Sequence, residues 1–209
     1  MTAQDVLTAI GRVQPPSTVG LRALRRKLSR ELATSERKQV LKLANDLIDS
    51  GRYRWIAYEL IKNHAPTAGS LSAKEVEHLG RGISDWGTVD CFGCYIAGPS
   101  WRAGSISDRL IFRWAASKDR WWRRAALVST VPLNVRAQGG QGDPARTLAV
   151  CEKLVDDRDD MVVKALSWAL RALSVRDAAS VQRFVRDHEP RLAALVKRQV
   201  RHKLEWGKL

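Results

Sequence analysis

Apolar residues recur at spacings of three and four along most of the chain, and this periodicity constrains the fold more than any other feature. Two early stripes are Leu21, Leu24, Leu28 and Leu32, followed by Val40, Leu41, Ala44 and Leu47. Residues at these spacings lie on one face of an α-helix. The two-residue alternation of a half-buried strand is missing from the sequence. The pattern therefore predicts an all-α fold of about a dozen helices.

Side chains that cap helix N-termini precede several of the predicted helices. The predicted caps are Ser35, Ser72, Asp85 and Asp143. Ser72 and Glu75 have the spacing of a capping box, in which each side chain bonds the backbone N–H of the other residue. Pro144 follows Asp143 at the first helical position, where no N–H is needed. These signals predict helices separated by short turns.

The predicted helices follow one another in pairs, which is typical of a stacked helical repeat. Each pair is rotated slightly from the one before it, so the array curves into an α-α superhelix with a concave groove. A globular helical bundle is the competing architecture. No linker-like stretch divides the chain, and we therefore expect a single domain over residues 1–209.

Positive charge is the strongest global property of the sequence. Lysine and arginine number 36 against 22 acidic residues, which gives a formal net charge of +14. The cations are concentrated in residues 22–30, 118–124 and 191–203. Three such clusters in a helical chain favour contact with a nucleic-acid backbone over a merely solvated surface. Anionic lipid is a weaker candidate, because these segments lack a free apolar face. The predicted groove is therefore basic.

The sequence also indicates a compartment and an absence of cofactors. No apolar run reaches the ~18 residues of a membrane span, and the first residues lack the order of a signal peptide. We expect a cytoplasmic, nucleoid-associated monomer with no membrane contact. Cys91 and Cys94 form a CxxC without a second pair or a histidine at ligand spacing. With Cys151, they are predicted to be small core residues and not metal ligands, and no cofactor is expected.

Few catalytic mechanisms fit these residues. No serine or cysteine is next to a paired base, and no two carboxylates stand out as an acid–base pair. A lone carboxylate beside aromatic residues suffices for the loss of a purine that alkylation has already made cationic. The base leaves as a neutral molecule, so only the oxocarbenium character of the sugar needs stabilisation by a fixed anion. Trp86, four residues before Asp90, provides an indole and a carboxylate on one helix face.

Three segments carry a family resemblance: WGTVD at 86–90, WWRRAALVSTV at 121–131 and VVKALSWALR at 162–171. In this order they resemble the AlkD-like DNA alkylation repair family of bacterial glycosylases. The resemblance spans about residues 20–200. It implies HEAT-like helical repeats that wrap duplex DNA and excise cationic 3- and 7-alkylpurines without a metal or cofactor. It also implies little or no base flipping.

The same resemblance implies roles for individual residues. Asp90 falls on the catalytic aspartate, and Trp86 and Trp168 fall on the two tryptophans beside the lesion. Arg124 falls on the arginine that contacts the DNA backbone, and Arg123 is the alternative, because the sequence does not fix which of the two turns inward. Without the resemblance, Asp90 is a surface ion-pair partner and both tryptophans are core residues.

Other residues complete this set of predictions. Arg171 ends the third motif and is expected to contact DNA as well. It is followed by Ala172, where relatives often have a glutamate, and the region before Gly20 is short for the family. The remaining tryptophans are predicted to pack between repeats: Trp101, Trp114, Trp121, Trp122 and Trp206.

The leading hypothesis is a monofunctional DNA glycosylase of base-excision repair. Its substrate is duplex DNA with cationic alkylated purines of the 3-methyladenine or 7-methylguanine type, and Asp90 stabilises the sugar cation. Two alternative functions require the helical fold but no catalytic activity. One is a non-catalytic protein that binds damaged DNA, and the other is a scaffold that binds an acidic protein.

Overall fold

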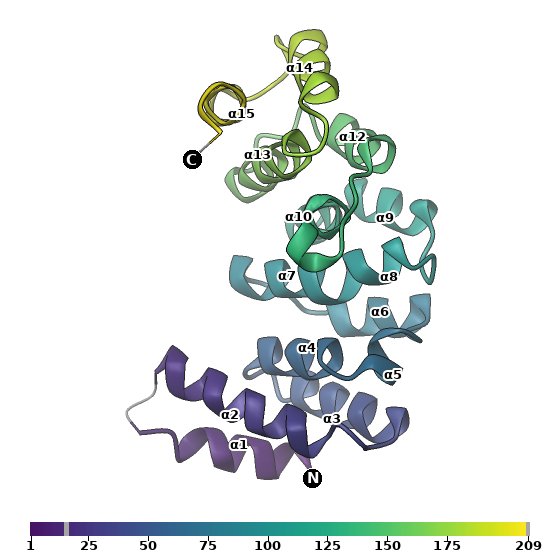
Figure 1. The fold of residues 1–209 in the computed structure, drawn as a ribbon, viewed down its shortest axis with the longest axis vertical. Coiled ribbons are helices and arrows are strands. Elements are labelled where there is room, and N and C mark those ends of the chain that lie inside the picture. Colours follow the sequence, from purple (N-terminus) through teal and green to yellow (C-terminus); the bar gives the residue numbers. More distant parts are fainter. Residues whose placement is uncertain (15–16, 208–209) are drawn as a thin grey trace. The chain divides into compact units, whose positions relative to one another are not determined.

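The structure is a computed structural model that describes residues 1–14 and 17–207. Within these two ranges the chain forms helices and connecting turns and no strand, which confirms the predicted all-α class. The chain divides into two compact units (Figure 1), unit 1 at Met1–Leu79 and unit 2 at Gly80–Leu209. The single domain over residues 1–209 and the basic groove along it stay predictions.

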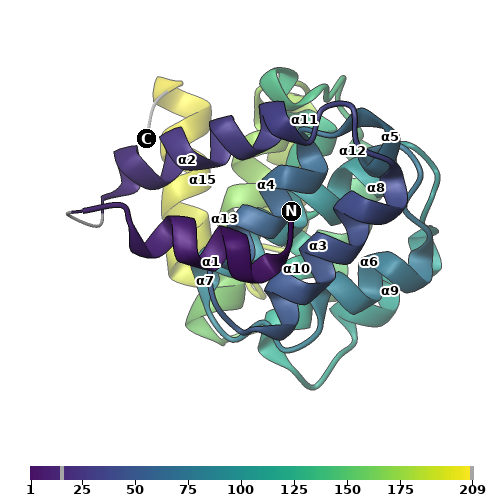
Figure 2. The ribbon, with the colours of Figure 1, turned by 90° about the horizontal axis from the view of Figure 1, so that it is seen from below.

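Unit 1 contains stacked helix pairs. Its helices are α1 (Ala3–Gly11), α2 (Thr18–Glu31), α3 (Arg37–Asp49), α4 (Arg54–Lys62), α5 (Ala65–Ala68) and most of α6 (Ala73–Gly80). Helices α1 and α2 run antiparallel (Figure 2), and α1 packs on α3 while α2 packs on α4. The apolar stripe of α3 is buried against α4, which contributes the fully buried Ile56 and Ile61. Unit 1 is thus built from two stacked pairs, as the repeat hypothesis requires.

Unit 2 continues the same pattern. Its α-helices are α7 (Trp86–Phe92), α8 (Gly98–Arg102), α9 (Asp108–Ala115), α10 (Arg120–Val128), α11 (Val131–Asn134), α12 (Pro144–Lys153), α13 (Asp160–Ser174), α14 (Ala178–Asp187) and α15 (Ala194–Trp206). The second helices of successive pairs form one layer, in which α10 packs on α7, α13 on α10 and α15 on α13. This layer contains nearly every candidate functional residue.

A π-helical segment, η1 (Gly93–Ala97), joins α7 to α8. The backbone is right-handed helical at both junctions, so residues 86–102 form one continuous helix. The N–H of Gly98 donates to the carbonyl of Gly93, five residues earlier. Single π-helical turns inside α-helices occur frequently at functional sites.

Most predicted caps are confirmed. The Asp85 carboxylate accepts from Thr88 N at 2.8 Å, and the carboxylate of Asp143 accepts from Arg146 N at 2.9 Å. Ser72 and Glu75 form the predicted capping box. The Ser35 cap is wrong: Ser35 lies in the turn after α2, where its N–H donates to Leu32 O, and the N-cap of α3 is Glu36. Helix α3 therefore begins after Glu36, whose side chain makes no capping bond.

The tryptophans assigned to packing do not all pack. Trp101 and Trp114 are buried, and Trp121 and Trp122 are half-buried. Trp206 contradicts the prediction, because its side chain is 69% exposed. It lies at the end of α15, beyond Val200, the last residue that this helix buries.

Other predictions concern the cysteines and the membrane. Cys94 and Cys151 are buried as predicted, whereas Cys91 is half-buried. Among the helices of the described ranges, none has both the length and the hydropathy that spanning a bilayer requires.

Candidate functional site

The candidate site starts at the N-terminus of α7, where Asp85 fixes the first turn. Trp86 and Asp90 are four residues apart and lie on one face of the helix. Trp86 is 62% exposed, so its indole is not part of the core. The side chain of Asp90 is 19% exposed. The helix therefore presents an open aromatic surface one turn before a partly accessible carboxylate.

Arg124 of α10 holds the Asp90 carboxylate with two parallel hydrogen bonds. Arg124 Nε donates to Oδ1 at 2.9 Å, and Nη2 donates to Oδ2 at 2.8 Å. This fork-to-fork geometry is the strongest form of arginine–carboxylate pairing. The Arg124 side chain is only 7% exposed. The arginine that was expected to hold a DNA phosphate is thus buried and committed to the expected catalytic aspartate.

A third bond connects Arg124 to the next helix. Arg124 Nη1 donates to the backbone carbonyl of Met161 at 2.5 Å, in the first turn of α13. One guanidinium therefore joins α7, α10 and α13, and its plane and direction are fixed. Because the carboxylate is bound at both oxygens, its orientation is fixed too.

Burial determines the acid–base behaviour of Asp90. Removal from water raises the pKa of the Asp90 carboxyl above its ordinary value. The hydrogen bonds and charge of Arg124 lower that pKa in opposition, and the negative charge of Asp85 raises it further. The net direction is upward, so Asp90 takes up a proton at a higher pH than an ordinary aspartate.

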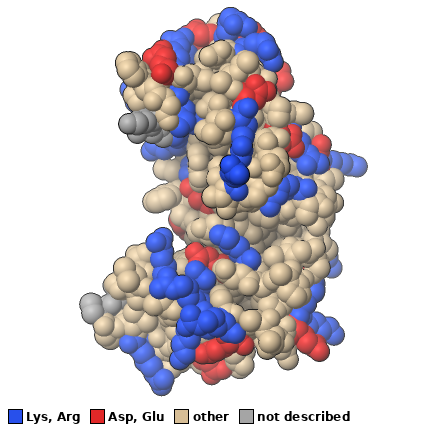
Figure 3. Space-filling view, in the orientation of Figure 1, with Lys and Arg blue, Asp and Glu red and all other residues tan. Residues whose placement is uncertain are grey.

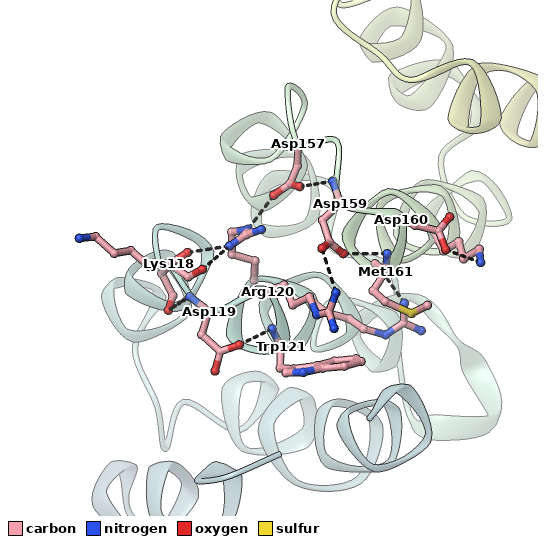
Figure 4. Close-up of polar contacts among 12 residues, drawn as sticks. Lys118, Asp119, Arg120, Trp121, Asp157, Asp159, Asp160 and Met161 are labelled. Atoms are coloured by element: carbon pink, nitrogen blue, oxygen red, sulfur yellow. Dashed lines mark hydrogen bonds and ion pairs between the residues drawn. The ribbon is translucent and has the colours of Figure 1, made fainter. Parts of the chain in front are cut away.

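Arg123 binds Asp157, which lies in the turn between α12 and α13 and is labelled in Figure 4. Its Nε donates to Asp157 Oδ2 at 2.7 Å, and its Nη1 donates to the carbonyls of Ser117 and Lys118 at 3.1 and 2.9 Å. Arg120, one turn earlier on α10, lies 3.4 Å from Asp159, which caps α13. All three arginines of α10 thus bind groups of unit 2.

Trp168 and Arg171 lie further along α13. Trp168 is half-buried and is two turns after Met161, on the same side of the helix. Arg171 Nε donates to Ser167 Oγ at 3.2 Å, and Ser167 in turn donates to Gln199 of α15. Within residues 1–14 and 17–207 Arg171 forms no ion pair. Burial without a counter-charge lowers the pKa of its guanidinium.

Two functional groups were missed by the sequence analysis. The Met161 carbonyl is a backbone acceptor, and no residue type signals it. Asp157 belongs to the acidic run VDDRDD at 155–160, directly before a helix. That run was a usable signal, because a turn rich in carboxylates is a natural partner for the arginines of a neighbouring helix.

The fold and the site together define a class. A stack of helix pairs that fixes a partly open carboxylate with a buried arginine, beside an exposed indole, is a helical-repeat protein with a candidate nucleic-acid site. The profile of a family described as DNA alkylation repair enzyme matches residues 17–204. The chain belongs to this family and is thus an enzyme of alkylated-DNA repair with DNA as its partner. No curated protein matches the sequence.

Proposed function

We propose that the protein is a monofunctional DNA glycosylase that hydrolyses the N-glycosidic bond of cationic alkylated purines in duplex DNA. Asp90 stabilises the positive charge that develops on the sugar and positions the attacking water. Trp86 and Trp168 flank the lesion nucleotide, and an indole face attracts a cationic base by ~1–2 kcal/mol when desolvated. The departing base is neutral, so the site needs no general acid.

The observation that supports this proposal most is that the Asp90 carboxylate has a fixed orientation and is partly accessible to solvent. It is oriented by two bonds from Arg124 and still partly accessible. A buried structural ion pair has no need of the exposed indole one turn away. Prior orientation matters because a fixed anion stabilises a developing cation without reorganising during the reaction.

The positive charge of Arg124 reduces the electrostatic stabilisation that the Asp90 carboxylate gives to the sugar cation, and this reduction can be estimated. At an effective dielectric of about 20, a carboxylate about 4 Å from the sugar contributes ~4 kcal/mol. A guanidinium about 8 Å away opposes it by ~2 kcal/mol on the same scale. The net stabilisation of ~2 kcal/mol corresponds to an acceleration of about 30-fold. The remaining acceleration has to come from binding and from positioning of the water.

We assign the phosphate contact nearest the lesion to Arg171 and a supporting role to Arg124. Both donor edges of Arg124 are used within unit 2, whereas Arg171 has no carboxylate partner in the described part of the chain. A half-buried cation without a counter-ion is costly. A phosphate supplies the missing charge, and Ser167 and Gln199 hold the guanidinium ready for it.

The test is release of free base from methylated duplex DNA. Incubation followed by chromatography should yield 7-methylguanine and leave an abasic strand, and Asp90→Asn should slow the release about 1,000-fold. Arg171→Gln should weaken binding and reduce its salt dependence by about one phosphate contact.

Two other outcomes correspond to the alternative functions. Tight duplex binding without release of any base would identify a non-catalytic protein that binds damaged DNA. No duplex binding at moderate salt would leave the scaffold for an acidic protein partner.

A further inference from the structure

Two glycines of the helix 86–102 lie against α10 and the residues that follow it. A Cβ added at Gly93 would lie 2.6 Å from Val128 Cγ1 and 2.9 Å from Val128 Cβ. A Cβ at Gly98 would lie 2.6 Å from the carbonyl oxygen of Ser129 and 2.7 Å from Pro132 Cγ. Real Cβ atoms do not approach other atoms this closely, so both positions require glycine for the observed helix separation.

The π-helical turn explains how two glycines five residues apart reach the same neighbour. In an α-helix, residues i and i+5 point about 140° apart. In a π-turn of about 4.4 residues the same pair points about 50° apart. The bond from Gly98 N–H to Gly93 O is that π-turn. It turns both glycines toward α10 and α11, so that Gly93 lies against the Val128 side chain and Gly98 lies against the Ser129 carbonyl.

This close approach is one turn away from the candidate site. Gly93 follows Asp90 by three residues, and Val128 follows Arg124 by four. On each helix the two residues share a face. The Gly93–Val128 contact therefore limits the separation of α7 and α10 one turn away from the point where Asp90 meets Arg124. The bidentate bonds of 2.9 and 2.8 Å depend on that separation.

We infer that Gly93 is a positioning residue, which fixes the Asp90 carboxylate by letting α7 approach Val128. The expected effect of Gly93 on catalysis rests on the proposed function, whereas its effect on the Asp90–Arg124 hydrogen bonds does not. A methyl group at Gly93 moves α7 away from α10, stretches the Asp90–Arg124 bonds and misplaces the carboxylate. A misplacement of about 1 Å near reacting groups costs up to about 100-fold in rate.

The experiment compares Gly93→Ala with the double variant Gly93→Ala/Val128→Ala. In the double variant Cγ1, the nearest atom to the added methyl group, is removed, while Cβ remains. We expect Gly93→Ala to lower the single-turnover excision rate about 10- to 100-fold with duplex affinity nearly unchanged. The double variant should recover part of the lost rate, because Val128 Cβ would still lie 2.9 Å from the added methyl group. Should Gly93→Ala fail to fold, Val128→Ile takes its place, because it enlarges the same contact from the other side.

A second measurement is independent of activity. The Arg124 Nε proton bonds Asp90, so its solvent exchange, followed by nuclear magnetic resonance, should be slow in the wild type. The signal is assigned by its loss in Arg124→Lys. We expect faster exchange in Gly93→Ala and an intermediate exchange rate in the double variant. If the wild type releases no base, the proposed function fails, and this exchange measurement still decides the role of Gly93.

The control is Val181→Ala, which removes fully buried methyl groups from α14 in the same unit. It should lower thermal stability while leaving both the excision rate and the Arg124 exchange unchanged. The inference is overturned if Gly93→Ala lowers stability alone, as the control does. It is equally overturned if the double variant regains stability but neither part of the rate nor slower exchange than Gly93→Ala.

Discussion

Helix α2 leaves three of its arginines in solvent, whereas α10 uses its arginines to hold unit 2 together. Arg22, Arg26 and Arg30 are exposed, lie four residues apart on one face of α2, and form no ion pair within residues 1–14 and 17–207. Figure 3 shows lysine and arginine side chains gathered over this part of unit 1. On α10, Arg123 and Arg124 each bind a carboxylate and a carbonyl of another segment.

The difference separates two uses of the same residue. A solvated arginine contributes to polyanion binding by releasing counter-ions, and its contribution falls steeply with salt. The interactions of a buried, hydrogen-bonded arginine are screened much less by salt, and they fix the groups that the arginine touches. Net charge alone counts both kinds together. In this protein the first kind is expected to govern affinity and the second to govern chemistry and stability, and each prediction below tests one side of that division.

The largest effect is expected at the Asp90–Arg124 pair. Asp90→Asn removes the anion but leaves the Arg124 charge facing the sugar, so the loss is the full ~4 kcal/mol, or about 1,000-fold in rate. Asp90→Asn/Arg124→Gln removes both charges and should lose only about 30-fold. Single-turnover rates on methylated duplex DNA measure both values. A double variant as slow as Asp90→Asn would show that Arg124 has no electrostatic effect at the sugar.

The exposed stripe of α2 should give the next largest effect. Changing Arg22, Arg26 and Arg30 together to Gln should reduce duplex affinity by about 100-fold at low salt. It should also reduce the slope of log affinity against log salt by about 2.7, or ~0.9 per phosphate contact. The excision rate at saturating DNA should not change. Binding titrations at several salt concentrations give both quantities.

The control for α2 removes the same number of charges from cations that already have partners. Lys42, Lys164 and Arg191 pair with Asp46, Asp160 and Asp156. Changing these three to Gln should alter the salt slope much less. Equal slopes for the two triple variants would mean that only net charge matters, and the comparison between the helices would fail.

Arg123 should affect stability more than binding. Its bonds to Asp157 and to two carbonyls are charge-assisted, so Arg123→Gln should lower the free energy of unfolding by about 2 kcal/mol. Denaturant unfolding measures this, and Asp157→Asn completes a double-mutant cycle. Should Arg123→Gln instead keep its stability and flatten the salt dependence of binding, Arg123 would belong with the arginines of α2.

The smallest effect is expected in the pH dependence. Burial raises the pKa of the Asp90 carboxyl, and only its ionised form stabilises the sugar cation. The excision rate should therefore fall with decreasing pH at a higher pH than an ordinary aspartate would give. Asp85→Asn removes one charge that raises this pKa, and Asn still caps α7. The acid limb of the rate profile should move to lower pH in this variant, and movement to higher pH would contradict the assigned cause.

For folding stability the same pKa shift has the opposite consequence. A carboxyl whose pKa is raised by folding stabilises the folded state in its protonated form. This contribution is complete below the pKa of the unfolded chain and is lost as the pH rises through the raised value. Activity and this part of the stability thus change in opposite directions across one pH interval.

Local features of the fold were predictable, and contacts over long sequence distances were not. The Asp85 and Asp143 caps and the Ser72–Glu75 box act within three residues, so their spacing is visible in the sequence. The pairing of Asp90 with Arg124 spans 34 residues. Residues 124–134 are all buried. Because this segment has no alternation of apolar and polar positions, the sequence did not indicate whether Arg123 or Arg124 turns inward.

The position of the candidate site followed from the family resemblance, but its internal arrangement did not. The motifs around Trp86, Asp90 and Trp168 indicated the helices that carry the candidate site. They did not indicate that Arg124 would be buried against Asp90, because that depends on how closely α7 and α10 pack. The glycine that permits this packing, Gly93, has no side chain from which a role could be inferred.

One consequence of the Arg124 arrangement concerns thermal motion. The Met161 carbonyl and the Asp90 carboxylate bind opposite sides of one rigid, planar guanidinium. Fluctuations of the first turn of α13 therefore reach Asp90 through a single side chain, by one hydrogen bond on the Met161 side and two on the Asp90 side. A larger motion of that turn therefore causes a larger motion of the Asp90 carboxylate.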